Sequence, residues 1–515
     1  MTVSQELPDS RPHALVIGAG FGGLAAAVRL GARGYRVTVL DKLDQPGGRA
    51  YVRRRTAPGI DGEFVFDSGP TVITAPFLFE ELWQLAGRSL ADDVDLRPVA
   101  PFYRIRFADG TTFDYTGDAA AMREEVRKLA PGDVEGYERF VAESERIFEV
   151  GFEQLAHVPF GSVLDMARIV PQMMKLGSFR SVHGMVARHV KDERLRQVVS
   201  FHPLLVGGNP FSTTSIYTLI AFLERKWGVH YPVGGTGSLV NGLVGLIKGL
   251  GGTLRLGTQV AEILIEDGHA RGARLTTGER IAADLVVSNA DSAWTYRHLI
   301  PEHARRKWTN AKIEKARYSM SLFVWYFGTK RRYEDVAHHT ILLGPRYREL
   351  LDDIFEKKIV ADDFSLYLHR PTATDPNMAP PGCDGFYVLS PVPHLESGTD
   401  WASFAEVYRK RLEKFLGETV LPGLADEVVV SDVLTPQGFQ DDLLSFRGAA
   451  FGLEPVLTQS AWFRPHNASE DVKDLYFVGA GTHPGAGLPG VLSSAKVLDR
   501  IVPAPPVRPR APKIA

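Results

Sequence analysis

The sequence predicts an α/β fold with a parallel sheet that begins near the N-terminus, a mixed second sheet and a long helical segment. An apolar run at 13–17, apolar residues at helical spacing at 24–30 and a second apolar run at 36–40 form a βαβ unit. Residues 122–224 have a mostly helical pattern, and strand-like runs recur from 254 to 433. Strands that alternate with helices at the start of a chain are typical of α/β proteins.

The other elements follow in order along the chain. Residues 102–107 and 112–115 alternate around Asp109-Gly110, which predicts a β-hairpin. A meander that returns to one buried strand is expected at 254–265, 270–275 and 285–288. Further strands are expected at 319–327, 364–369, 386–390, 428–433 and 475–478, with helices at 239–250, 401–416 and 491–501. The proline-rich tail, 503–515, is expected to be disordered.

Composition and charge exclude several classes of protein. The 515 residues are 44% hydrophobic and 23% charged, which is typical of folded domains and not of disordered chains or coiled coils. The net charge of −2 offers no basic field for a nucleic-acid backbone, so we expect no nucleic-acid partner. The single cysteine, Cys383, cannot form an intrachain disulfide, and we expect a reducing, cytosolic location.

Membrane-spanning and secreted proteins are also disfavoured. The N-terminus has no apolar run that resembles a secretory signal. The long uncharged stretch, 197–223, contains Pro203, Gly207 and Pro210 in its middle. Because a membrane span needs an unbroken helix, this stretch predicts a helix, a turn and a buried helix instead.

A glycine-rich turn at the end of the first strand is the strongest chemical signal. Gly18-Ala19-Gly20-Phe21-Gly22-Gly23 lies between a strand and a helix, and Asp41 ends the second strand. Glycines in this position let a pyrophosphate approach the backbone and the helix N-terminus, and the acid accepts hydrogen bonds from a ribose. The turn therefore predicts a Rossmann-type dinucleotide site.

A second match to the same glycine pattern, Gly485 to Gly490, lacks the following acid. Pro489 suits the first turn of a helix, so this match is either an ordinary helix start or a second set of amides that face the same ligand. One bound dinucleotide is implied, and a nicotinamide cofactor has no evident site of its own.

Further motifs connect the chain to a known family. With the first glycine turn and Asp41, the sequences at 46–49 (PGGR) and 66–71 (FDSGPT) resemble the flavin-containing amine oxidase and phytoene desaturase superfamily. The sequences at 201–210, 462–467 and 478–487 narrow the resemblance to bacterial carotenoid desaturases of the phytoene desaturase type. The resemblance runs from residue 14 to residue 501.

The resemblance implies FAD as the cofactor. It places Gly18, Gly20 and Gly23 at the pyrophosphate and Asp41 at the adenosine ribose, although many members of the superfamily carry glutamate at that position. The other residues that it places around FAD are Gly48, Arg49, Gly69, Pro70, Thr71, Val260, Gly479, Ala480, Gly481, Leu488, Pro489, Gly490 and Val491.

The resemblance also implies how the chain is divided. An FAD-binding domain is expected from 1–95, 231–300 and 472–502, and a mixed-sheet substrate domain from 96–135 and 301–471. Residues 136–230 are expected to form a helical segment for membrane contact and substrate access.

The function implied is that of an FAD-dependent phytoene desaturase, which forms lycopene or neurosporene by successive dehydrogenations. Oxygen or a quinone is the expected electron acceptor. A later-step carotenoid desaturase, a carotene oxygenase or an isomerase would share the same motifs, an amine oxidase would share the FAD motifs, and a carrier of prenyl chains without chemistry stays open. The sequence identifies no catalytic base; His202 and Glu224 border the uncharged stretch and are the candidates.

Metal, hydrolytic and phosphoryl-transfer chemistry lack sequence support. His338 and His339 are adjacent, His183 and His189 are six residues apart, and no carboxylate completes a facial triad with them. We therefore expect no metal site. Neither a nucleophile elbow nor a Walker A loop is present.

One segment combines apolar and basic residues in a way that suits a membrane surface. Residues 160–191 carry Met166, Val170, Met173, Met174 and Leu176 together with Arg168, Lys175, Arg180, Arg188 and Lys191. Such a segment can place its apolar side in a bilayer and its cations toward anionic lipid headgroups, and it can equally be a pair of core-packed helices with a solvated basic face. We expect a cytoplasmic protein that associates peripherally with the inner face of the cell membrane.

Overall fold

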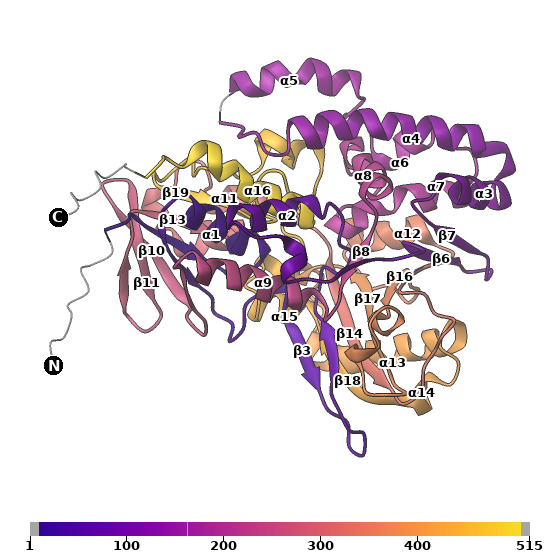
Figure 1. Cartoon of the computed structure of the whole chain (residues 1–515). Coiled ribbons are helices and arrows are strands. Elements are labelled where there is room, and N and C mark those ends of the chain that lie inside the picture. The colour runs from indigo at the N-terminus through magenta and orange to yellow at the C-terminus, as the bar shows by residue number, and fades with distance from the viewer. Residues whose placement is uncertain (1–9, 162, 506–515) are drawn as a thin grey trace.

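A computed structural model of the chain describes residues 10–161 and 163–505, and the side chains of these except 163–166. Residues 506–515 of the expected tail, and the side chain of Met166, lie outside the described part. Both described ends of the chain lie on the same side of the molecule, beside the parallel sheet (Figure 1).

The parallel sheet forms where the βαβ pattern predicts it. Its strand order is β19-β13-β1-β2-β9, and all four pairings are parallel. Helices α1, α9 and α16 cover one face of the sheet in a shared apolar core. The strands are β1 (His13–Ile17), β2 (Arg36–Leu40), β9 (Thr253–Arg255), β13 (Leu285–Ser288) and β19 (Leu475–Phe477); the helices are α1 (Phe21–Ala32), α9 (Thr236–Gly249) and α16 (Leu488–Ile501).

The expected strand at 254–265 is wrong in one respect, because the structure divides it between two sheets. Leu254 pairs with Val39 in the parallel sheet, whereas Val260 starts an antiparallel sheet that covers the other face of the parallel sheet. Gly257, at φ +61°, lies in the turn between the two strands. The antiparallel sheet consists of β10 (Val260–Glu266), β11 (His269–Leu275) and β12 (Arg280–Ala282).

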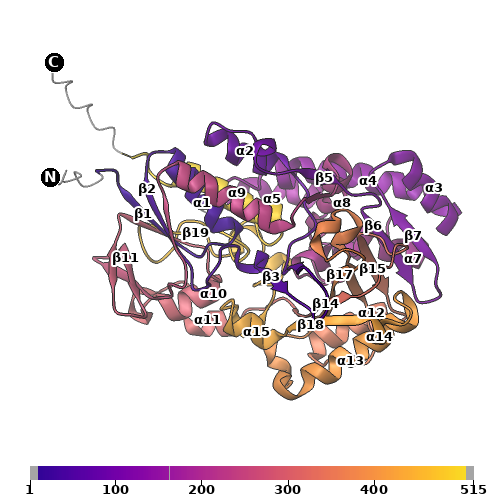
Figure 2. The same cartoon turned by 60° about the horizontal axis from the view of Figure 1, so that its bottom comes forward.

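A seven-stranded mixed sheet forms the second half of the molecule. Its order is β18-β14-β17-β16-β15-β6-β7, and α13 packs on the face opposite to the cavity described below (Figure 2). The strands are β6 (Tyr103–Phe107), β7 (Thr112–Tyr115), β14 (Ser321–Thr329), β15 (His339–Leu343), β16 (Leu366–His369), β17 (Asp384–Val392) and β18 (Val428–Leu434).

Strand β15 was not among the predicted strands, although it holds this sheet together. It pairs antiparallel with β16 and parallel with β6, and so joins the early hairpin to strands more than 200 residues later in the sequence. All five of its residues are buried. A short run such as this gives no periodicity by which a strand can be distinguished from a buried helix.

The helical segment forms a layer over both sheets, with α5 outermost above α4 (Figure 1). The stretch 197–223 contains the end of one helix, a short 3₁₀ turn at His202–Val206 and the start of another, as expected. Among the described residues, no helix is both long and apolar enough to cross a bilayer. The helices are α3 (Ala119–Leu129), α4 (Val134–Phe148), α5 (Val163–Lys175), α6 (Val182–Val186), α7 (Glu193–Ser200) and α8 (Leu219–Trp227).

Short elements complete the chain. The hairpin β3–β4 projects from the body of the molecule (Figure 1). The remaining elements are β3 (Val52–Arg55), β4 (Phe64–Asp67), α2 (Phe77–Leu85), β5 (Leu96–Pro98), β8 (His230–Pro232), α10 (Ser292–Trp294), α11 (Asn310–Lys315), α12 (Tyr347–Asp352), α13 (Trp401–Thr419), α14 (Leu424–Glu427) and α15 (Pro436–Asp441).

A buried cation connects three helices around the parallel sheet. The Arg29 guanidinium on α1 is 2% exposed and contacts Glu81 on α2 at 2.8 Å and Asp499 on α16 at 2.6 Å. Lys496 also contacts Glu81, at 2.7 Å, but is 34% exposed. Burial raises the pKa of Glu81, but Arg29 and Lys496 outweigh it and hold that pKa below its ordinary value.

We predict that Arg29→Met destabilises the protein by about 2–3 kcal/mol, because it leaves two carboxylates without their buried partner. Lys496→Met, the matched control on the exposed side of Glu81, should cost less than about 1 kcal/mol. Urea unfolding followed by circular dichroism measures both. Because the pKa of Glu81 is lowered, the stabilisation is present at neutral pH and is lost as the pH falls through that pKa. Equal effects of the two variants would contradict this role of Arg29.

Candidate active site

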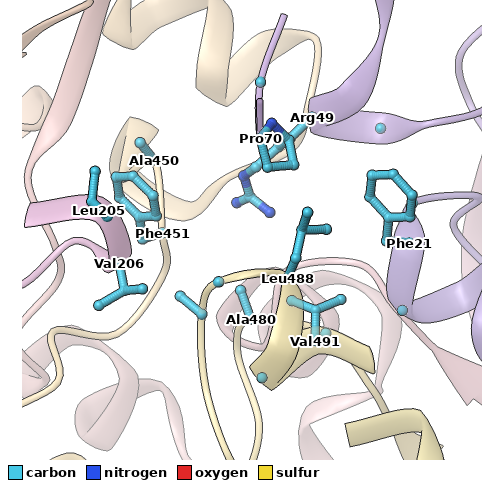
Figure 3. Close-up of a pocket in the computed structure, with 18 of the residues that line it drawn as sticks. Phe21, Arg49, Pro70, Leu205, Val206, Ala450, Phe451, Ala480, Leu488 and Val491 are labelled. Carbon is cyan, nitrogen blue, oxygen red and sulfur yellow. The ribbon is translucent and has the colours of Figure 1, made fainter. Parts of the chain in front are cut away.

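A long cavity lies between the parallel sheet, the helical segment and the seven-stranded sheet. Its volume is about 530 Å³, within the range of ligand pockets, and most of its lining is apolar. Its lining includes Gly18 and Asp41 beside the glycine-rich turn, and Ile169 and Met173 on α5. In the middle, Arg49 and Pro70 lie on one side, Leu488 and Val491 on a second, and Leu205, Val206 and Phe451 on a third (Figure 3).

The first end of the cavity is built by the turn between β1 and α1. A Cβ on Gly23 would collide with the Gly18 carbonyl oxygen, so the helix approaches the strand only because residue 23 has no side chain. Gly20 is the N-cap of α1 and offers no side chain to its first amides. Those amides are therefore free to bind an anionic group, as a pyrophosphate requires.

Asp41 is held at the same end by the backbone. Its Oδ2 accepts a hydrogen bond from Ala19 N at 2.6 Å and its Oδ1 one from Leu43 N at 2.8 Å. Burial raises the pKa of this carboxyl group, and the two backbone donors offset part of that effect. Each oxygen keeps a further lone pair, so the carboxylate can also accept from ribose hydroxyls. Val260, predicted near the adenine, lines this end as well.

The middle of the cavity combines a cation with a close backbone approach. A Cβ on Gly69 would lie 2.8 Å from the Arg49 carbonyl oxygen, so only glycine fits there. The Arg49 side chain donates to Ser445 Oγ at 3.0 Å and points into the cavity (Figure 3). Burial lowers the pKa of Arg49, and the nearby Asp291 carboxylate opposes this change. Gly48, Pro70 and Thr71 line the same region, as expected for residues near a cofactor.

The opposite wall is the start of α16. The helix begins at Leu488, three residues before the sequence predicts, with Pro489 in its first turn as expected. Ala480 and the whole stretch from Leu488 to Val491 line the cavity. Gly479 lines it too, and its amide donates to Ser494 Oγ at 2.8 Å.

Two of the residues predicted to bind the cofactor do not line the cavity. Gly23 instead allows α1 to pack on β1, and a Cβ on Gly481 would lie 2.5 Å from Ser292 Oγ. Asn289, by contrast, was missed by the sequence reasoning although it lines the cavity between the first glycine-rich turn and Gly479. No sequence motif marks it, because its place depends on β13 packing beside β1.

The remaining half of the cavity is a channel of aliphatic side chains. Leu322, Val324, Ile341 and Leu343 contribute from β14 and β15, Met320 lies just before β14, and a further wall comes from the helical segment. The residues of that wall are Leu204, Leu205, Val206, Ile216, Leu219, Ile220 and Leu223. Such a channel can hold a long apolar molecule and exclude water from the middle of the cavity.

One carboxylate interrupts this apolar lining. Glu224 lines the cavity, is fully buried, and accepts a hydrogen bond from Tyr103 OH at 2.7 Å. His202 Nε2 lies 3.2 Å from the other carboxylate oxygen but does not line the cavity. Burial, and then the Glu224 charge, raise the pKa of Tyr103 well above its usual value, so Tyr103 stays a donor. The structure thus places the two candidate bases, His202 and Glu224, beside each other. Of the two, only Glu224 lines the cavity, where it can contact a ligand.

Three buried histidines lie behind the cavity wall. His338, His339 and His369 each place a ring nitrogen within 4.8 Å of the others. Burial lowers the pKa of His338 to about 3 and those of the other two well below the usual value, with nearby positive charges adding to the effect. The sequence reasoning considered His338 with His339 and His183 with His189 but not His369, because His369 joins the cluster only through pairing of β15 with β16.

Comparison with known proteins identifies the family. A family model described as "Flavin containing amine oxidoreductase" matches residues 21–497. A phytoene desaturase (lycopene-forming) of Pseudescherichia vulneris is 51% identical over 94% of this chain and 97% of its own. A phytoene desaturase (neurosporene-forming) of Cereibacter sphaeroides is 49% identical over 96% and 95%.

Solved structures confirm the predicted fold. An oxidoreductase from Methanosarcina mazei has a TM-score of 0.60 at 20% identity and covers 95% of this chain and 99% of its own. Wild-type putrescine oxidase bound to putrescine has a TM-score of 0.63 at 14% identity, over 96% and 100%. The glycine cradle, Asp41 and the two helix N-termini fit a bound FAD. The chain therefore belongs to the flavin-containing amine oxidoreductase family and, within it, to the family of the bacterial phytoene desaturases.

Proposed function

We propose that this chain is an FAD-dependent phytoene desaturase, which converts phytoene by successive dehydrogenations to lycopene or neurosporene. The observation that carries the proposal is one cavity whose lining joins the dinucleotide turn to an aliphatic wall from β14, β15 and the helical segment, and to Ile169 and Met173 on α5. A channel of this kind suits a long hydrocarbon better than a small charged amine. The names of the relatives at about half identity support the same activity, and they differ in the product formed.

We also propose which residues hold the cofactor. The amides at the start of α1 would bind the pyrophosphate, Asp41 the adenosine ribose, and Arg49 with the start of α16 would flank the flavin. When bound, FAD supplies the acceptor for the hydride that leaves the substrate. The work of the chain is then to position the hydrocarbon, exclude water and receive the proton. We expect oxygen or a quinone to reoxidise the flavin.

We predict that Asp41→Asn lowers FAD affinity at least tenfold, because the amide carries no charge and one of its two polar atoms cannot accept a hydrogen bond. Asp41→Glu keeps the charge and should retain FAD more fully. Asp44→Asn, in the exposed loop that follows, is the matched control and should bind as the original chain does. Quenching of flavin fluorescence on titration measures the affinity. If Asp41→Asn binds FAD as tightly as the original chain does, Asp41 does not bind the adenosine ribose.

Glu224 is the proposed proton acceptor. A desaturation removes a hydride from one carbon and a proton from its neighbour, and Glu224 is a buried carboxylate on the aliphatic part of the wall. Tyr103 and His202 hold its two oxygens in place. The proton would pass to the Glu224 carboxylate, with His202 behind it as the next group.

We predict that Glu224→Gln slows flavin reduction by phytoene about 10²-fold or more while leaving FAD bound. Tyr103→Phe, which keeps the carboxylate and removes one of its donors, should have a smaller effect. The assay uses the protein with FAD and phytoene in liposomes, without nicotinamide, and follows flavin bleaching in the absence of oxygen and quinones. An unchanged rate in Glu224→Gln would contradict the assignment of the base.

The same assay tests the function itself. With phytoene, the original chain should develop the visible absorption of a long conjugated polyene, because each turnover lengthens the chromophore. Colour that forms only from neurosporene or lycopene would indicate a later-step carotenoid enzyme. Bleaching by amines alone would indicate an amine oxidase, and flavin that stays oxidised with every polyene would indicate a carrier.

We further propose that the protein lies on the inner face of the cell membrane through α5 and the turn after it. Val170, Met174 and Phe179 are 40%, 56% and 53% exposed there. Ile169 and Met173, on the same helix, line the cavity. This surface would place the end of the channel at the bilayer, where a hydrocarbon substrate is dissolved. Lys175 and Arg180 add positive charge for anionic headgroups.

We predict that Lys175→Glu with Arg180→Glu weakens binding to anionic vesicles at least tenfold at low salt, since each basic residue near such a surface contributes about 1 kcal/mol. The matched control, Lys410→Glu with Lys414→Glu, makes the same charge change at two exposed positions on α13, far from α5 (Figure 1). Sedimentation with phosphatidylserine vesicles measures both. If the two double variants bind the vesicles equally well, the membrane contact does not involve Lys175 and Arg180.

A further inference from the structure

The three histidines behind the cavity wall lack most of the partners that buried imidazoles need. His338, His339 and His369 are 5%, 0% and 0% exposed. Within the described part of the chain, Nε2 of His338, Nε2 of His339 and both ring nitrogens of His369 have no hydrogen-bond partner. Each buried polar atom without a partner costs about 1–3 kcal/mol, so four of them in one place indicate a missing ligand.

The two nitrogens that do have partners complete the pattern of a metal site. Nδ1 of His338 lies 2.6 Å from Thr374 Oγ1, and Nδ1 of His339 lies 2.6 Å from Tyr367 OH. When each Nδ1 donates its proton to the hydroxyl oxygen, Nε2 carries the lone pair. Histidines that bind metals are commonly oriented in this way, by a hydrogen bond from the ring nitrogen that faces away from the ion.

The ring positions match three imidazoles around one ion. A zinc ion binds imidazole nitrogen at about 2.0–2.1 Å, so two rings at a tetrahedral angle have centroids about 5 Å apart. The centroids here are separated by 4.5 Å (His338–His339), 4.8 Å (His338–His369) and 5.3 Å (His339–His369). His339 and His369 are direct partners across β15 and β16, which fixes their spacing.

We propose that His338, His339 and His369 form a binding site for one divalent first-row transition-metal ion, of which Zn²⁺ fits best. Three imidazole ligands with no thiolate suit zinc rather than calcium or magnesium, which prefer oxygen ligands. A water would complete the coordination from a cleft that His338 lines together with Glu334 and Asp335. The same cleft is lined by Arg104, Arg332 and Arg370, so these two acids offset part of its positive charge at the point where the ion would enter.

The surroundings tolerate a metal ion because the neighbouring guanidinium, that of Arg370, already has an anionic partner. Arg370, next to His369, contacts Asp384 at 3.0 Å, and that carboxylate is fully buried. The ion would join β15 to β16, two strands that also supply Ile341, Leu343 and Tyr367 to the cavity wall. Its role would therefore be to hold that wall in place. This inference does not depend on the proposed function.

The test is metal binding by the FAD-loaded protein after treatment with a chelator. Titration with Co²⁺ should give one equivalent per chain, with visible d–d bands at wavelengths beyond the flavin absorption, and Zn²⁺ should displace it. X-ray absorption of the zinc form should show nitrogen ligands at about 2.0–2.1 Å with imidazole scattering. If the original chain binds no Co²⁺ in this way, the proposal is wrong.

Variants locate the site. His369→Asn should lower Zn²⁺ affinity at least 100-fold, and Thr374→Val, which removes only the partner of His338, should lower it about 10–100-fold. His394→Asn changes another buried histidine outside the cluster and should bind as the original chain does. Equal binding by all three variants would mean that the ion is adventitious and would overturn the assignment. If His369→Asn does not fold, as judged by FAD content, Thr374→Val decides.

Discussion

The close contact between the first strand and the first helix is the constraint on which the cavity depends. Because Gly23 has no side chain, α1 packs directly on β1 beside the Gly18 carbonyl. This contact aims the free amides of α1 at the cavity, places the Ala19 amide on Asp41, and leaves room for Asn289 and the start of α16. Any side chain at residue 23 would push the helix outward and open the dinucleotide end. The positions of the other polar groups at this end of the cavity therefore depend on the contact between α1 and β1.

The distribution of polar groups within the cavity follows from the cost of burying them. Charged and polar groups gather at the dinucleotide end, where a bound cofactor would give them partners. In the aliphatic half, Glu224 is tolerated because Tyr103 and His202 contact its two oxygens. Thr71 is likewise paired with Tyr387 OH at 2.6 Å and Tyr367 OH at 3.0 Å. The histidine cluster is the exception, since several of its ring nitrogens stay without partners in the described chain. That contrast is why a further ligand is inferred there and not at Glu224.

The path of the cavity explains why the chain devotes so many residues to a layer of helices. A substrate that dissolves in lipid must reach a dry site deep between two sheets. The helical segment provides both an aliphatic part of the cavity wall and the exposed apolar side chains of α5, and α5 is the outermost helix of that layer (Figure 1).

The sequence by itself determined the features that depend on neighbouring residues. The strand at 13–17, the glycine turn, the second strand and Asp41 at its end were all predicted, because period and turn chemistry are local properties. Most of the residues that the family resemblance assigns to FAD line one cavity. Only the tertiary structure decided that Leu254 and Val260 belong to different sheets, that β15 joins β6 to β16, and that His369 lies opposite His339. These facts depend on which strands pair and in what register. Which distant strands pair depends on how the whole chain buries its apolar side chains, and no short sequence pattern predicts that pairing.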